Sequence, residues 1–225
     1  MTTIAILSEG RTDQEVIEQV LLGFFERADD LEIHKIFPPE IPLPGEPEAG
    51  GWTVLRRRLA DGDHRQALRF NDYVVIHIDT DVCEDAGFDV PRRAPATGDA
   101  LDPNALRTAV IERLIEWLGE GFYAAHGHRV LFAIAVESIE CWLLPLLEDK
   151  PAKQRKIAGC RVAADAALQR AGRRLLGADD RVRVYANEAA PYRKRKTLLK
   201  KGPLSPSLGA FLDELTGRGI EIHAG

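Results

Sequence analysis

The chain has 225 residues, enough for one large domain or for one domain with an elaboration. Its 45% hydrophobic and 29% charged residues can form a packed core, which excludes disorder along the whole chain. The net charge of −5 and the pI near 5.7 do not favour nucleic acid as a partner, although local charge matters more than the sum. We find no signal-peptide pattern and no apolar run near the ~20 residues of a membrane helix, so we expect no membrane partner.

Short apolar runs that end in polar residues predict buried parallel strands, and helical spacing predicts helices between them. The first half of the chain should form a strand at 4–7, a helix at 12–27, a strand at 31–37, helices at 52–59 and 65–70, and a strand at 73–78. The second half should form a helix at 103–118, a strand at 129–136, helices at 138–147 and on to about 176, and a last helix at 207–215. This alternation predicts an α/β fold with a Rossmann-like parallel sheet flanked by helices. We expect an α/β domain over 1–150 and a helical C-terminal extension over 151–225, packed on the same core.

Capping residues and loops separate these elements. Thr12 is the expected N-cap of the first helix, and Ser138 that of the helix at 138–147. Asp102 should cap the helix at 103–118. The proline-rich segment 38–47 and the segment 82–102 lack periodicity and predict long loops.

The three cysteines are scattered at Cys83, Cys141 and Cys160, and no Cys-x-x-Cys pair is present. This pattern predicts neither a zinc site nor a disulfide framework. Free cysteines are typical of a reducing compartment, so we expect a cytoplasmic protein.

Acidic residues follow three of the predicted strands. Glu9 comes after the first strand, Asp79 and Asp81 after the third, and Glu137 and Glu140 after the fourth. Because ligands bind at the carboxyl ends of the strands in an open α/β sheet, we expect these carboxylates to meet at one edge. Crowded carboxylates resist ionisation unless a cation neutralises them, and oxygen ligands suit Mg²⁺ or Mn²⁺. The pattern predicts a metal-dependent enzyme that acts on phosphates.

Neighbouring polar residues also have simpler interpretations. Asp13 complements the N-terminus of the first helix and is more typical of a structural than of a catalytic residue. His77 lies inside a strand, which favours a core histidine with satisfied hydrogen bonds. Glu137 and Glu140 would favour the dipole of the helix that they precede or begin.

One dense basic cluster stands near the C-terminus of this acidic chain. It comprises Arg193, Lys194, Arg195, Lys196, Lys200 and Lys201. A run of like charges is usually a solvated surface, but it can also contact a phosphate backbone.

The motifs together resemble a known family. The segment 8–13 and Asp79-Thr80-Asp81 look like the Glu-Gly and Asp-x-Asp motifs of TOPRIM domains, found in topoisomerases, primases and OLD-type nucleases. With Glu140-Cys141-Trp142-Leu143-Leu144, the chain is similar over residues 3 to about 147 to the bacterial TOPRIM-like group catalogued as domain of unknown function 4276. Related sequences often follow Trp-Leu-Leu with Ala-Asp, whereas this chain departs from that pattern with Pro145 directly after Leu144.

The resemblance implies a metal-dependent nuclease of DNA or RNA. Glu9 would act as general acid/base or metal ligand, Asp79 and Asp81 would bind Mg²⁺, and Glu140 would complete a second metal position. Lys194 or Lys196 would lie near the scissile phosphate. By analogy with genes that accompany such proteins, the resemblance also implies a role as effector in anti-phage defence and a partner ATPase.

Two other functions remain open at this point. Asp79 and Asp81 also match the nucleophile motif of haloacid-dehalogenase-type phosphohydrolases and phosphotransferases, although that motif usually follows the first strand. A non-catalytic regulatory partner of an ATPase would keep the fold without productive metal binding.

Overall fold

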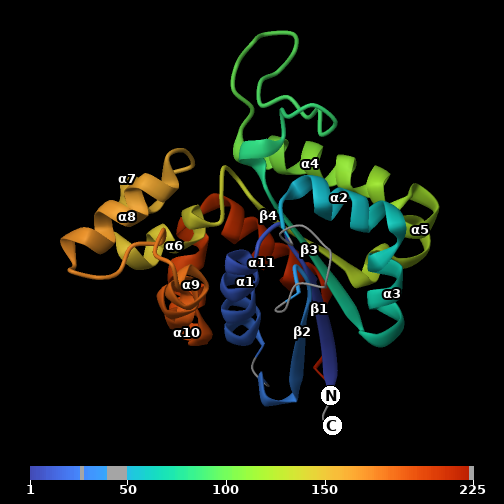
Figure 1. Cartoon of the computed structure of the whole chain (residues 1–225), viewed down its shortest axis with the longest axis horizontal. Helices are drawn as coiled ribbons and strands as arrows, with labels where there is room; N and C mark the ends of the chain where they lie inside the picture. The colour runs from blue at the N-terminus through green and yellow to red at the C-terminus, as the bar shows by residue number, and fades with distance from the viewer. Residues whose placement is uncertain (26–27, 40–49, 223–225) are drawn as a thin grey trace.

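The computed structural model describes residues 1–25, 28–39 and 50–222, so most of the expected proline-rich loop at 38–47 lies outside the described residues. Four parallel strands form one sheet in the order β2-β1-β3-β4 (Figure 1). They are β1 (Thr2–Leu7), β2 (Leu31–Phe37), β3 (Tyr73–Asp79) and β4 (Val130–Ala135). Apolar residues fill both faces of β1, β3 and β4, as a sheet covered on both sides requires. The expected parallel α/β fold is confirmed.

Helices cover both faces of the sheet, so a hydrophobic core lies on each face. Alternate residues of a strand pack into one core or the other. Ile4 and Ile6 pack on one face, whereas Ala5 and Leu7 pack on the other. The first face carries α1 (Arg11–Phe24), α6 (Glu140–Leu147), α8 (Cys160–Arg170), α9 (Arg181–Ala189), α10 (Arg195–Lys201) and α11 (Pro206–Arg218). The second face carries α2 (Trp52–Asp61), α3 (Asp63–Phe70), α4 (Pro103–Leu118) and α5 (Glu120–His126). Figure 1 shows these two groups on opposite sides of the strands.

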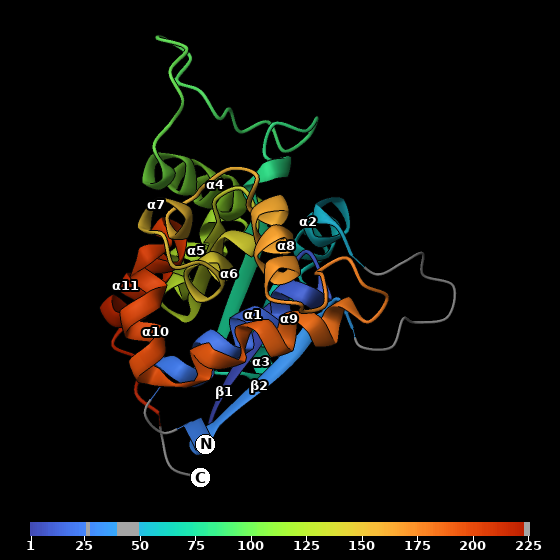
Figure 2. The same ribbon diagram turned by 90° about the vertical axis from the view of Figure 1, so that its left-hand side faces the viewer.

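The helices after residue 150 pack on the same core as α1 and α6. Trp142 of α6 is fully buried, stacks on Phe211 of α11 with ring centroids 5.6 Å apart, and donates a 3.0 Å hydrogen bond from Nε1 to Ser207. Figure 2 shows α9 and α10 lying along α1. The short α7 (Pro151–Gln154) joins α6 to α8. The expected helical C-terminal region on the shared core is therefore present.

Side chains block the outer edge of β4. Oε1 of Glu214 accepts a 3.1 Å hydrogen bond from the backbone N of Phe132, and Arg107 donates to the carbonyl of the same residue at 3.3 Å. Arg218 donates to the carbonyl of Val130 at 3.1 Å. These contacts occupy edge groups that could otherwise pair with another chain.

Short 3₁₀ turns and one long loop complete the connections. The turns are η1 (Ala28–Asp30), η2 (Thr80–Val82), η3 (Gly127–Arg129), η4 (Ala190–Arg193) and η5 (Gly202–Leu204). The expected loop at 82–102 projects beyond α4 in Figure 1 and contains an antiparallel bridge between Arg93 and Ala100. Asp102 caps α4, as expected, by accepting from the backbone N of Asn104 at 2.9 Å. None of the helices within the described ranges combines the length and apolar composition needed to span a bilayer.

Candidate functional site

Two neighbouring strands end at the point where the sheet changes winding direction. Chain order runs from β1 outward to β2 and then returns to β3 on the other side of β1. After β1 the chain enters α1 on one face, and after β3 it leads to α4 on the opposite face. Such a switch point is where open α/β sheets bind ligands. Glu9 follows β1 and Asp79 is the last residue of β3, so both lie at this point.

A cavity of about 650 Å³ opens at the switch point. Its acidic lining residues include Glu9, Asp13, Asp79 and Glu140. The sequence-predicted residues Glu9, Asp79 and Glu140 thus share one cavity, although each follows a different strand. Asp81 is exposed in η2 and is not a lining residue, but its charge acts on Glu9.

The Glu9 carboxyl group is half-buried, and its hydrogen bonds do not offset the cost of burying its charge. Burial, and then the charge of Asp81, raise the pKa of Glu9 from 4.5 to about 7, while backbone hydrogen bonds from Asp79 and Trp52 oppose the rise. Oε2 of Glu9 is buried and has no hydrogen-bond partner among the described residues. A buried carboxylate oxygen without a partner is unfavourable, and a cation would satisfy it.

The pKa values of Asp79 and Asp81 are also raised. Burial raises the pKa of Asp79 well above 3.8, and the charges of Asp13, Glu9 and Glu140 add to the rise. Burial also raises the pKa of Asp81, with the nearby guanidinium of Arg92 opposing it. Arg92 donates to the carbonyl of Thr80 at 2.6 Å and so fixes the turn between the two aspartates.

Asp13 combines the expected structural role with a place in the cavity. Gly10, not Thr12, is the N-cap of α1, because the helix begins at Arg11. Asp13 accepts the backbone N–H of Gly10 at 2.7 Å and so supplies the side-chain half of a capping box. Burial, and then the charge of Glu9, raise the pKa of Asp13 to about 8. Its carboxyl group therefore holds a proton at neutral pH.

His77 is buried as expected, but its ring is not satisfied. Neither ring nitrogen makes a hydrogen bond to a described residue. The nearest polar atoms are Oδ2 of Asp13, 3.6 Å from Nδ1, and Oδ1 of Asp79, 3.4 Å from Nε2. Burial lowers the pKa of His77 to about 3, so the ring is uncharged at neutral pH.

Glu140 also lines the cavity. It is the first residue of α6, whose N-cap is Ile139 and not the expected Ser138. Oε1 of Glu140 accepts hydrogen bonds from the Tyr185 hydroxyl and from Nη1 of Arg161, the latter at 3.2 Å. These two contacts from α8 and α9 fix the carboxylate although it is buried.

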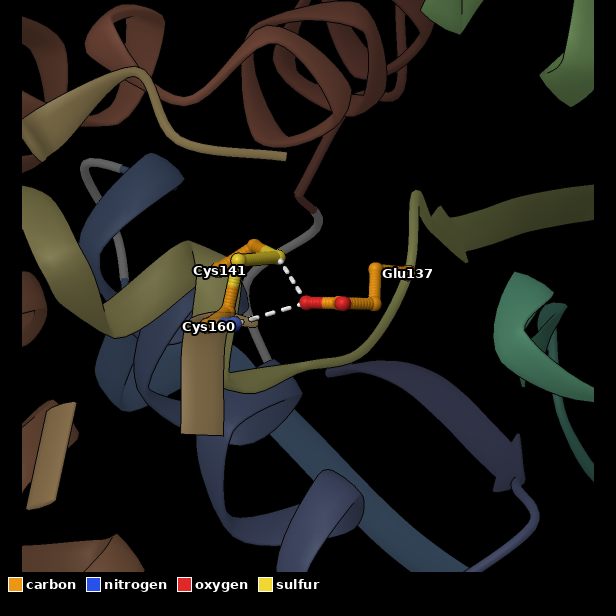
Figure 3. Close-up of side chains that lie close together, drawn as sticks. All are labelled: Glu137, Cys141 and Cys160. Atoms are coloured by element: carbon orange, nitrogen blue, oxygen red, sulfur yellow. Dashed lines mark hydrogen bonds between the residues drawn. A yellow bond between two sulfur atoms is a disulfide. The ribbon is translucent and has the colours of Figure 1, made fainter. Parts of the chain in front are cut away.

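Glu137 does not line the cavity. Its backbone has a left-handed conformation, with φ of 65°, and its carboxylate accepts backbone N–H groups of Gly159 and Cys160, the latter at 2.7 Å (Figure 3). The expectation that Glu137 lies among the metal-binding carboxylates is therefore corrected: it holds the start of α8.

A disulfide joins Cys141 to Cys160 beside Glu137 (Figure 3), so the expectation that the cysteines form no disulfide was wrong. The packing of α6 on α8 brings the two cysteines together across 19 positions of sequence, which spacing alone could not show. Cys83 is free and buried. The three side chains of Glu137, Cys141 and Cys160 lie close enough to coordinate a metal, but sulfurs bonded to each other do not offer thiolate ligands.

Lys194 and Lys196 lie at the other end of α1 from the carboxylates, which corrects the expected placement beside them. The preceding segment packs on the last turn of α1, where a Cβ on Gly23 would come within 1.9 Å of the Tyr192 carbonyl oxygen. Arg195 lies over the Phe24 ring, 5.6 Å from its centroid. Because α1 has 14 residues, this end is about 20 Å from Gly10.

Three arginines line the cavity in place of these lysines: Arg11, Arg161 and Arg181. They come from the first turns of α1, α8 and α9. Arg11 lies within the Glu-Gly motif, whereas no sequence signal distinguished Arg161 and Arg181 from the other arginines of the helical extension. The cavity is therefore lined by both acidic and basic side chains.

The donor set suits a hard divalent cation. The acidic residues that line the cavity offer carboxylate oxygens, and the buried Oε2 of Glu9 has no hydrogen-bond partner among the described residues. A comparison of the chain with protein-family models, curated proteins and solved structures finds no match. The function must therefore be inferred from the site itself.

Proposed function

We propose that the chain is a Mg²⁺- or Mn²⁺-dependent, TOPRIM-like endonuclease that hydrolyses phosphodiester bonds of DNA or RNA. The observation that carries this proposal is the cavity shared by Glu9, Asp79 and Glu140 at the switch point of the sheet. A cavity lined by both carboxylates and arginines suits a substrate that carries negative charge and a metal that offsets it.

The side chains that line the cavity would bind either the cation or the phosphate. Glu9 and Asp79 would hold the cation, with Asp81 next to them. Glu140, which Arg161 holds in an ion pair, would add a further carboxylate. When bound, the metal supplies an activated water and stabilises charge on the phosphate. With a pKa of about 7, Glu9 can exchange a proton near neutral pH in the metal-free site. Arg11 and Arg181 would contact phosphate oxygens.

The resemblance also supports a role in the cell, as an effector of bacterial anti-phage defence that works with a partner ATPase. Nucleic acid remains compatible with an acidic chain because both the arginines that line the cavity and the cluster at 193–201 are locally positive.

Incubation of the purified protein with supercoiled plasmid and with RNA tests the proposal. Cleavage should occur with Mg²⁺ or Mn²⁺, stop with EDTA, and be lost in Asp79→Asn. Asp149→Asn, which changes an exposed aspartate after α6, should cleave as the wild type does. No cleavage by the wild type under any of these conditions would contradict an enzyme that is active alone. Covalent transfer of phosphate to Asp79 would instead support the phosphotransferase alternative.

A further inference from the structure

A buried imidazole lies between two carboxyl groups beneath the proposed metal site. His77 precedes Asp79 by two positions in β3, so the two side chains point to the same face of the sheet. The ring is 0% exposed. Its Nε2 lies 3.4 Å from Oδ1 of Asp79, and its Nδ1 lies 3.6 Å from Oδ2 of Asp13.

An aromatic side chain also packs against the imidazole. The Trp142 ring meets it edge to face, with centroids 6.3 Å apart. Neither His77 nitrogen nor Oδ1 of Asp79 has a hydrogen bond to any other described residue. Buried polar atoms are nearly always paired, so the two carboxyl groups are the partners that this ring can use.

An uncharged imidazole offers one N–H donor and one acceptor nitrogen. Asp79 presents an oxygen at the shorter of the two contacts, and Oδ2 of Asp13 lies farther away, beside the other nitrogen. A proton on Nε2 gives Oδ1 of Asp79 the partner that it lacks among the described residues, whereas the opposite tautomer would turn the lone pair of Nε2 toward that oxygen.

We propose that His77 is a positioning residue whose Nε2–H donates to Oδ1 of Asp79 and fixes that carboxylate for cation binding. The inference rests on the proposed metal site. Oriented ligands of this kind depend on such outer partners for their affinity. Because Asp13 also holds the backbone N–H of Gly10, the chain Asp13–His77–Asp79 ties the turn that carries Glu9 to the end of β3.

Substitutions that mimic one nitrogen at a time test this role. The amide nitrogen of Gln reaches the position of Nε2, that of Asn reaches the position of Nδ1, and Leu offers no donor. Titration of each variant with Mn²⁺, followed by electron paramagnetic resonance, should show about 10- to 100-fold weaker binding for His77→Leu and His77→Asn. His77→Gln should return the affinity to within about threefold of the wild type.

A spectroscopic measurement on the wild type covers the case in which a variant fails to fold. Nitrogen-15 NMR of the metal-free protein should show the His77 ring protonated at Nε2. Protonation at Nδ1, or equal Mn²⁺ affinity in folded His77→Leu, would overturn the inference. Mn²⁺ binding that depends on His77 without any cleavage of nucleic acid would overturn the proposed function and leave the inference standing. If the wild type bound no Mn²⁺, both the proposed metal site and this inference would be overturned.

Discussion

Glu140 and Arg161 form an ion pair, 3.2 Å between Oε1 and Nη1, and each directly adjoins one cysteine of the Cys141–Cys160 disulfide. The disulfide thus joins the first turns of α6 and α8, and those turns carry the pair that forms one wall of the cavity. A covalent link at this place couples the stability of the fold to the shape of the site.

Loss of the disulfide should destabilise the protein. For a loop closed across 19 positions, the chain-entropy argument predicts that Cys160→Ala lowers the free energy of unfolding by about 3 kcal/mol. Urea denaturation with and without reductant measures this. Reduced wild type should match Cys160→Ala, and reductant should still destabilise Cys83→Ala, which keeps the disulfide. Wild-type stability that does not respond to reductant would contradict the expectation.

The buried carboxyl groups of Glu9 and Asp13 should each make the metal-free protein less stable as pH rises. Their pKa values are raised to about 7 and about 8 in the folded state, so between about pH 4 and pH 8 each of these two groups binds more protons in the folded than in the unfolded state. Their contribution to the free energy of unfolding therefore falls across this range, by on the order of 3 kcal/mol for Glu9, whereas His77, whose pKa is lowered to about 3, acts in the opposite direction.

Thermal melts at pH 5 and pH 8 measure this effect. Glu9→Gln should flatten the decline, and Mg²⁺ should raise the melting temperature more at pH 8 than at pH 5. The same pH dependence of stability in the wild type and in Glu9→Gln would show that the Glu9 carboxyl group is not buried as described.

The blocked edge of β4 should contribute measurably to stability. Glu214→Ala removes the acceptor of the Phe132 backbone N–H and the partner of Arg107, and we expect a loss of about 1–3 kcal/mol. Asp213→Ala changes the exposed neighbour on the same helix and should cost much less. Equal stability of the two variants in urea denaturation would argue against the edge contact.

The basic cluster should matter only for long substrates. A distance of about 20 Å spans about six nucleotides, so a polynucleotide at the cavity can also reach Lys194 and Lys196. The double alanine variant should bind long single-stranded DNA more weakly, and the slope of its salt dependence should flatten by about 0.7 for each phosphate that the protein no longer neutralises. Hydrolysis of a small phosphodiester should not change. Lys150→Ala serves as the control, and an unchanged salt slope in the double variant would assign the cluster to a solvated surface.

The sheet could be predicted from the sequence because its strands are buried on both faces and read as continuous apolar runs. The same runs predicted that Glu9 and Asp79 meet at one edge, since the carboxyl ends of parallel strands share it. Glu140 could be expected there only because it begins the helix after β4. Its contacts with Arg161 and Tyr185 depend on how the C-terminal helices pack.

Features that depend on tertiary packing could not be predicted from the sequence. Cys141 and Cys160 meet because α6 packs on α8, and the carboxylate of Glu137 turns toward α8 because its backbone adopts a positive φ. His77 looked like an ordinary core residue because periodicity shows burial but not hydrogen-bond partners. Lys194 and Lys196 formed the most visible positive cluster, yet the cavity takes its positive charge from dispersed arginines.

Calorimetric titration with Mn²⁺ tests the central claim, that Glu9 and Asp79 hold a divalent cation at the switch point. Wild type and Asp149→Asn should bind Mn²⁺ with equal affinity, whereas Asp79→Asn and Glu9→Gln should lose measurable binding. Both of these variants should also melt at a higher temperature than wild type without metal at pH 8, because each removes a buried charge. Mn²⁺ binding of unchanged affinity in Asp79→Asn would contradict the account.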